Sequence, residues 1–173
     1  MLVLRLEARH FRGFAHAVVL PRGHALVVGE PRAGRSDLLA ALKRVLDPDA
    51  TKATLEEWDF HGRDLGRDIE IEVVLGELAP DLRHRFLGEL EFWDPDRELV
   101  LPGSDTTQQL AAAGATPVLR LAYRGRWNHA EEGGEHWVAF AKSSDPDADQ
   151  FKRVPRADRA VLPFLAGPSW LLG

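Results

Sequence analysis

The sequence of 173 residues contains no cysteine, which excludes disulfides and thiolate metal sites and favours a cytoplasmic location. It also lacks any apolar run that approaches the ~20 residues needed for a membrane-spanning helix. The N-terminus alternates apolar and polar residues and has no long apolar stretch typical of a signal peptide. We therefore expect a globular domain without a membrane partner.

The net charge is −5, and positive and negative residues are unevenly distributed along the chain. Residues 1–50 carry eight Lys/Arg against five Asp/Glu, whereas residues 51–115 carry six against fifteen. The basic N-terminal part contains a glycine-rich segment, which suits an anionic ligand such as a nucleotide. No basic stripe is present, so charge alone does not predict DNA binding.

Hydrophobic periodicity predicts a strand, loop and helix in the N-terminal part. Residues 2–11 alternate like a strand, and residues 15–20 return as the second strand of a hairpin. Residues 25–28 are continuously apolar, as expected of a strand buried on both faces. Apolar residues then recur at helical spacing from Ser36 until Pro48 closes the helix.

The remainder of the chain predicts mostly antiparallel strands. Residues 69–75 alternate aliphatic residues with glutamate, which indicates a strand with one solvated face. Residues 118–127 and 136–142 read as a hairpin. We also expect a short helix at 80–90, a strand at 98–101, a helix or loop at 106–113, and an irregular segment at 51–66 anchored by Trp58 and Phe60.

The glycine-rich segment is Gly-Glu-Pro-Arg-Ala-Gly-Arg-Ser at residues 29–36, which has the spacing G-x-x-x-x-G-K-[ST] with arginine in place of lysine. In such a loop, backbone N–H groups surround phosphates and the following helix points its positive end at them. The serine hydroxyl holds Mg²⁺, which makes Ser36 the candidate metal ligand. The candidate nucleotide-binding residues of this segment and of the position after it are Gly29, Arg32, Ala33, Gly34, Arg35, Ser36 and Asp37.

Two residues depart from the phosphate-loop pattern. Arg35 is bulkier than lysine and planar, and Pro31 has no N–H to donate to a phosphate. The alternative is a structural turn between strand and helix, with Gly34 near the helix start and Ser36 as its N-cap. The loop alone leaves both interpretations open.

Three segments of the chain resemble sequence motifs that occur together in one protein family. Residues 10–14, His-Phe-Arg-Gly-Phe, are similar to the motif N-F-[RK]-[GS]-[FY], and residues 34–48 are similar to G-K-S-N-L-L-x-A-L-R-x-V-L-D-P. Residues 57–60 resemble a D-F segment that precedes a strand. Over residues 2–76 the chain thus resembles the N-terminal ATPase lobe of the OLD (overcoming lysogenization defect) family of ATP-dependent nucleases, which are ABC-type ATPases related to RecF and SMC proteins.

The resemblance implies an α/β fold, namely the first lobe of an ABC-type P-loop NTPase with a mixed sheet and an antiparallel β-rich portion. One lobe would span residues 1–173, with hairpin, phosphate loop and helix in 1–50 and antiparallel strands in 51–173. ATP and Mg²⁺ are the implied ligands, and Arg12 is carried over as a nucleotide contact. The family acts in DNA cleavage, DNA repair and phage defence, so we expect DNA as a partner through a separate portion and a homodimer of the full-length protein.

Parts that the family needs for catalysis are not recognisable, among them a signature segment, an apolar strand ending in Asp-Glu, and a nuclease domain. We therefore expect a fragment of a longer protein or a degenerate stand-alone copy, and we assign no catalytic residue. One alternative is a non-catalytic interaction or dimerisation module with a vestigial phosphate loop. Another is an unrelated enzyme that uses the same strand, turn and helix for a different anion.

Histidines form two weaker candidate sites. His129 and His136 would be a metal pair if they faced each other across the predicted hairpin, but no third ligand accompanies them, so exposed hairpin residues are expected. His61 and Asp64 have the composition of an acid–base pair, but no nucleophile is placed beside them.

Overall fold

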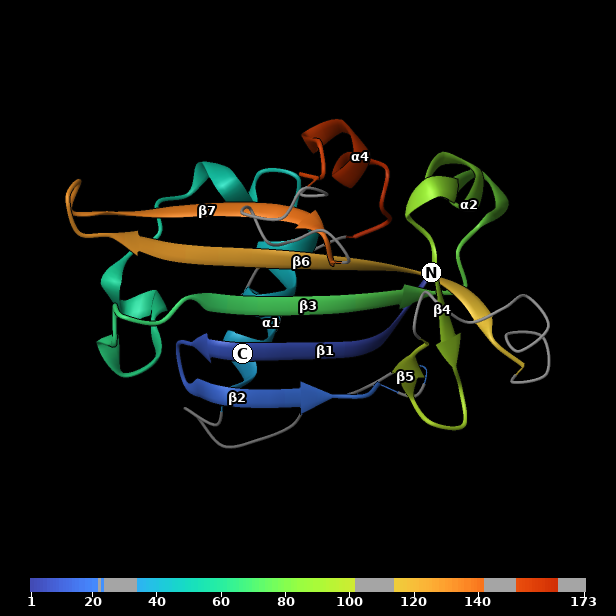
Figure 1. The fold of residues 1–173 in the computed structure, drawn as a ribbon, viewed down its shortest axis with the longest axis horizontal. Helices are drawn as coiled ribbons and strands as arrows, with labels where there is room; N and C mark the ends of the chain where they lie inside the picture. Colours follow the sequence, from blue (N-terminus) through green and yellow to red (C-terminus); the bar gives the residue numbers. More distant parts are fainter. Residues whose placement is uncertain (22, 24–33, 102–113, 142–151, 165–173) are drawn as a thin grey trace.

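The computed structural model describes residues 1–21, 23, 34–101, 114–141 and 152–164. Its strands form one sheet in the order β2-β1-β3-β6-β4-β5, and β7 also pairs with β6 (Figure 1). Every pairing between the described strands is antiparallel. The strands are β1 Leu2–Phe11, β2 Phe14–Val19, β3 Ile69–Gly76, β4 Glu91–Asp94, β5 Leu99–Val100, β6 Thr116–Asn128 and β7 Gly133–Phe140.

The helix α1, Arg35–Leu46, covers one face of this sheet (Figure 1). It is the longest described helix and lies behind the sheet in the view of Figure 1. The shorter elements are α2 Pro80–Arg85, α4 Arg156–Ala160, η1 Ala50–Lys52, η2 Glu57–Asp59, η3 His61–Arg63 and η4 Leu87–Glu89. No helix in the described ranges is both long enough and apolar enough to cross a membrane.

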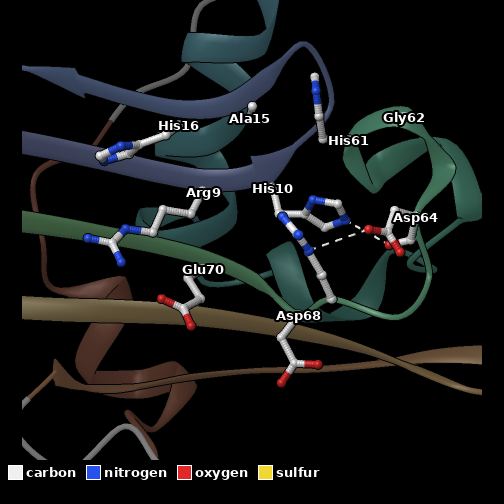
Figure 2. Close-up of a pocket in the computed structure, with 10 residues that line it drawn as sticks. Arg9, His10, Ala15, His16, His61, Gly62, Asp64, Asp68 and Glu70 are labelled. Carbon is white, nitrogen blue, oxygen red and sulfur yellow. Dashed lines mark hydrogen bonds and ion pairs between the residues drawn. The ribbon is translucent and has the colours of Figure 1, made fainter.

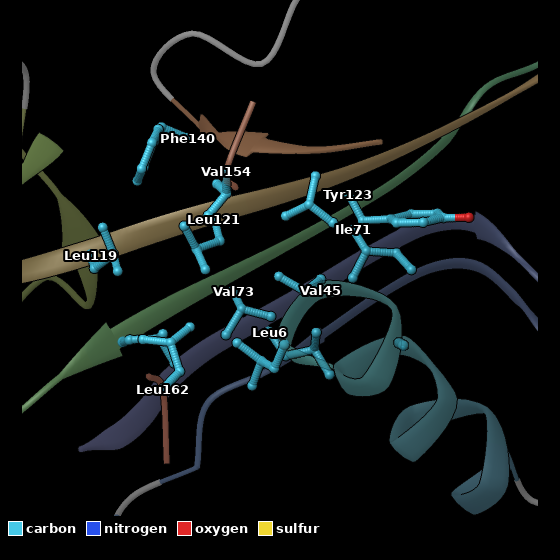
Figure 3. Close-up of a cluster of buried hydrophobic side chains, with 14 of the residues drawn as sticks. Leu6, Val45, Ile71, Val73, Leu119, Leu121, Tyr123, Phe140, Val154 and Leu162 are labelled. Carbon is cyan, nitrogen blue, oxygen red and sulfur yellow. The ribbon is translucent and has the colours of Figure 1, made fainter. Parts of the chain in front are cut away.

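The core lies between the sheet and α1 because alternate strand residues point to the same face. Leu6 of β1, with Ile71 and Val73 of β3, packs in one cluster with Val45 of α1 (Figure 3). These four side chains are at most 2% exposed. The alternation that predicted β1 and β3 therefore has the expected physical cause, the burial of one face.

The opposite face of the sheet is charged. Glu72 of β3 accepts a hydrogen bond from Arg124 of β6 at 2.8 Å, and Arg120 of β6 binds Glu91 of β4 at 2.9 Å. Just before the start of β3, Asp68 pairs with Arg126 at 2.9 Å. Cross-strand pairs of opposite charge stabilise neighbouring strands.

The helix α1 begins at a glycine that the backbone requires. Gly34 is the N-cap and has a φ of 83°, a left-handed conformation that other residues adopt at a cost. A Cβ at this position would also lie 3.0 Å from Cε1 of Phe14. Gly34 therefore lets the helix start directly against the β1–β2 hairpin.

The sequence predictions for the strands at 2–11, 15–20, 69–75 and 98–101 and for the long hairpin are confirmed, as is the helix α1. The α/β class is confirmed in its coarse form, with the qualification that the described part of the sheet is antiparallel throughout, not mixed. Residues 25–33 and 106–113 lie outside the described residues.

Two details of the sequence analysis were wrong. Trp58 was expected to anchor its segment, but its side chain is 61% exposed, whereas the expected anchor Phe60 is 1% exposed. The strand β4 was not predicted, because its alternation extends over only four residues.

Candidate functional site

The turn between β1 and β2 meets the first turn of α1. The backbone N–H of Gly13 donates to Oδ2 of Asp37 at 3.3 Å, although the two residues are 24 positions apart in the chain. Nη1 of Arg12 lies 3.9 Å from Oδ1 of the same carboxylate. The fold thus brings Arg12 beside the residues at the start of α1 that the sequence analysis selected.

The start of α1 has the properties of an anion-binding helix end. The first intrahelical bond runs from the N–H of Leu38 to the carbonyl of Gly34, so the preceding amides have no intrahelical acceptor. Those amides and the helix dipole form a positive end. Ser36 is exposed and Arg35 is half-buried. Gly29, Arg32 and Ala33 lie outside the described residues.

The structural alternative for Ser36 was wrong in its detail. The N-cap of α1 is Gly34, and no side chain makes a capping hydrogen bond there. Ser36 is the second residue of α1, in its first turn, and is exposed to solvent. The side chain of Ser36 is therefore available to a ligand.

Arg12 has an unusual backbone conformation that neighbouring residues hold in place. Its φ is 48°, in the left-handed region that residues with a Cβ adopt at a cost. Its N–H donates to the carbonyl of Asp59 at 2.8 Å, and its carbonyl accepts a hydrogen bond from Nδ1 of His61 at 2.8 Å. Such strain persists only where the surroundings determine it, as they do here.

The side chain of Arg12 is fixed by the same segment. Nε of Arg12 donates to Oδ1 of Asp59 at 2.9 Å, and the guanidinium carbon lies 5.2 Å from the ring centre of Phe11. The Arg12 side chain is 33% exposed, whereas that of Asp59 is only 2% exposed. The side chain of Arg12 is therefore partly exposed to solvent while it is held by a buried carboxylate.

A second arginine holds Asp59 from the core side. Nη2 of Arg44 on α1 donates to Oδ2 of Asp59 at 2.8 Å. The guanidinium of Arg44 also lies 5.8 Å from the ring centre of Tyr123 on β6. Burial raises the pKa of Tyr123. Asp59 is thus a buried carboxylate shared between Arg44 and Arg12.

The series of buried polar contacts that starts at Asp59 and Arg44 continues to the hairpin of β6 and β7. The hydroxyl of Tyr123 lies 2.9 Å from Nδ1 of His136 on β7. Burial, with a smaller contribution from the positive charge of Arg44, lowers the pKa of His136. A neutral imidazole with its proton on Nε2 accepts the Tyr123 O–H, so the lowered pKa and the hydrogen bond favour the same protonation state.

The expectation of exposed hairpin histidines is confirmed for His129 and was wrong for His136, which is half-buried. In the hairpin register His136 lies opposite Gly125, and His129 comes after the end of β6 at Asn128. His136 is instead bonded to Tyr123. Among the residues that the structure describes, no group of three or more metal-ligating side chains could hold a metal ion.

A polar cavity of about 850 Å³ opens on the other side of the β1–β2 turn (Figure 2). His61 and Asp64, which the sequence analysis weighed as an acid–base pair, both line it, but the side chain of each binds another partner. His61 binds the carbonyl of Arg12, and the carbonyl of Asp64 accepts a hydrogen bond from Nε2 of His10 at 2.7 Å. The carboxylate of Asp64 lies 3.5 Å from Nε of Arg67, so these two charges of the cavity are paired with each other.

Sequence reasoning missed Arg44 and Asp59. Arg44 occurs on the apolar face of α1, one residue before the buried Val45, and a charged residue on such a face signals a buried partner. Asp59 precedes the buried Phe60, in the segment already noted for its D-F pattern. Neither signal tells which residue pairs with which.

No family model matches this chain. A curated protein named "Probable transporter efuK", from Hormonema carpetanum, is 31% identical over 105 residues. The aligned part covers 58% of this chain but only 14% of that protein. The chain is therefore similar to a small part of this relative.

Proposed function

We propose that this chain binds Mg-ATP where the β1–β2 turn meets the first turn of α1, as the N-terminal lobe of an OLD/RecF-like ABC-type ATPase. The observation that supports this proposal is the approach of Arg12 to the start of α1, with Nη1 3.9 Å from Asp37. Two motifs that resemble the same family from separate parts of the sequence thus lie together. The whole protein would be an ATP-dependent DNA endonuclease or DNA-repair ATPase.

The described residues divide the work of binding. The amides at the start of α1 would receive phosphate oxygens, because helix N-termini bind anions without a particular side chain. Arg35 would add positive charge, and Arg12 would contact the nucleotide from the facing turn. Asp37 would keep the two elements together through its bond to the N–H of Gly13.

Magnesium fits this site as an ion that arrives with the nucleotide. Mg²⁺ usually keeps several waters and is bound through few protein ligands together with substrate phosphates. Ser36 offers one exposed hydroxyl oxygen at the first turn of α1, which is where such an ion needs a protein ligand. The ion would supply charge neutralisation to the phosphates, and Ser36 would orient it.

Calorimetric titration with Mg-ATP tests the proposal. We expect weak binding that Arg35→Lys strengthens, because a compact ammonium suits an enclosed phosphate site better than a planar guanidinium. We expect Ser36→Ala to weaken binding and to reduce its dependence on Mg²⁺. Arg83→Lys is the matched control, since Arg83 is exposed on α2, away from α1.

The competing function is a non-catalytic interaction module with a vestigial loop, which the presence of Pro31 and Arg35 in the loop favours. It predicts no binding by the wild type at millimolar Mg-ATP and no gain from Arg35→Lys. That result would remove the nucleotide assignment. The match to the probable transporter covers too little of that protein to bring transport to this chain.

We expect neither ATP hydrolysis nor a nucleotide-bridged dimer from this chain by itself. Phosphoryl transfer needs a positioned metal, an oriented water and stabilisation of transition-state charge together, and only the phosphate cradle is recognisable in the sequence. A phosphate-release assay and light scattering with a non-hydrolysable ATP analogue test these expectations. Turnover of several ATP per second, or dimerisation that depends on the analogue, would contradict them.

A further inference from the structure

Asp59 binds Arg12 twice, through its backbone and through its side chain. Its carbonyl accepts the N–H of Arg12 at 2.8 Å, and its Oδ1 accepts the Nε–H at 2.9 Å. An arginine on a turn ordinarily has many rotamers, and fixing it for a ligand costs conformational entropy. Here one residue holds both the backbone and the guanidinium of Arg12 before any ligand arrives.

The carboxylate of Asp59 cannot turn away from Arg12 without losing other bonds. Its Oδ2 accepts from Nη2 of Arg44 at 2.8 Å and from the N–H of Glu56 at 3.2 Å. Arg44 is 8% exposed and comes from α1, the same helix whose first turn faces Arg12. The buried carboxylate of Asp59 thus connects Arg12 to α1 and fixes the orientation of Arg12 relative to that helix.

The bond through Nε determines which part of Arg12 remains for a ligand. Asp59 uses Nε, and Nη1 lies at the start of α1, 3.9 Å from Oδ1 of Asp37. The guanidinium fork can therefore present its Nη groups to phosphate oxygens while Nε stays bound to Asp59. Arginine suits this double use because its donors have a fixed planar arrangement.

We propose that Asp59 is a positioning residue for nucleotide binding, which holds the guanidinium of Arg12 at the first turn of α1 with Arg44 as its buried support. The proposal rests on the proposed Mg-ATP site and adds a residue to it. Asp59 does not contact the nucleotide, and its effect on affinity passes through Arg12.

A double-mutant cycle on Mg-ATP affinity measures this dependence. Arg12→Ala should weaken binding about tenfold, the loss of one charge-assisted hydrogen bond. Asp59→Asn should weaken binding by a similar factor in the wild type and cause no further loss in the Arg12→Ala background, because coupled residues are not additive. Equal losses in both backgrounds would overturn the positioning role and leave the Mg-ATP site standing.

The matched control is Asp94→Asn. Asp94 is a buried carboxylate on β4 that accepts the N–H of Asp96 at 2.9 Å and of Arg97 at 3.0 Å, at the other end of the sheet from the β1–β2 turn (Figure 1). Its substitution should lower thermal stability without a change in Mg-ATP affinity. A loss of affinity that merely follows stability in Asp94→Asn would overturn the proposal.

A second variant and a second measurement cover the case in which Asp59→Asn does not fold. Arg12→Lys keeps the positive charge but lacks Nε, so it should weaken Mg-ATP binding as much as Arg12→Ala does. In the wild type, NMR should show a slowly exchanging Nε–H for Arg12 without nucleotide. Full affinity in Arg12→Lys, or a rapidly exchanging Nε–H, would overturn the inference, whereas a wild type that binds no Mg-ATP would overturn the proposed function as well.

Discussion

Two Asp–Arg ion pairs in this molecule have nearly the same N···O distance, but one pair is buried and the other is exposed to solvent. Asp59 and Arg44 are 2.8 Å apart, and their side chains are 2% and 10% exposed. Asp68 and Arg126 are 2.9 Å apart, and their side chains are 35% and 47% exposed. The first pair lies between α1 and the sheet, and the second lies at the start of β3.

The two pairs differ in burial and not in contact distance, and burial is what determines the contribution of an ion pair to stability. An exposed pair exchanges water for a partner at little gain, whereas a buried charge that loses its partner has no water to replace it. The buried pair therefore fixes geometry beside the candidate site. The exposed pair belongs to a charged face where water can substitute for any one partner.

The largest expected effect comes from breaking the buried pair. Asp59→Asn should lower the free energy of unfolding by about 3–5 kcal/mol, because it leaves the charge of Arg44 buried without compensation. Urea denaturation followed by circular dichroism measures the change. A loss below about 1 kcal/mol would place this pair in the same class as the exposed one.

A smaller loss of stability is expected from breaking the hydrogen bond between Tyr123 and His136 in the long hairpin. Tyr123→Phe removes the hydroxyl that binds Nδ1 of His136 and should lower the free energy of unfolding by about 1 kcal/mol, the usual net value of one hydrogen bond. The double variant with His136→Gln tells whether the loss belongs to this bond. Additive losses in the double variant would show that the two side chains act independently.

The exposed pair should contribute less. Asp68→Asn should lower the free energy of unfolding by about 0.2–1 kcal/mol. In 1 M NaCl, where the Debye length is about 3 Å, the difference from the wild type should vanish, whereas the effect of Asp59→Asn should persist. A salt-independent loss at Asp68 would contradict the distinction between the two pairs.

The smallest effect concerns pH. Burial lowers the pKa of His136 below its ordinary value of 6.5, so the unfolded state binds the proton first as the pH falls. The contribution of neutral His136 to stability is therefore complete above pH 6.5 and decreases below it, until the pH passes the lower pKa of the folded state. Urea unfolding of the wild type and of His136→Gln at pH 7.5 and 5.5 should show the wild type losing more on acidification.

The site was partly predictable because its candidate residues belong to local patterns. Gly34, Arg35 and Ser36 come from one loop motif, and Arg12 comes from one turn motif. The partnership of Arg12 with Asp59 spans 47 positions and has no local period, so no pattern in the sequence indicates it. Trp58 shows the same limit, since an aromatic residue in an irregular segment gives no sign of which side faces the core.

The sequence by itself determined β1, β2, β3, the long hairpin and the start of α1, because alternation, helical spacing and a glycine with a left-handed φ are local consequences of backbone geometry. Only the tertiary structure decided that Asp59 is shared by Arg12 and Arg44 and that His136 binds Tyr123 and not His129. Burial removes water as an alternative partner, so these groups pair with whatever polar atom the packing of α1 on the sheet brings within reach.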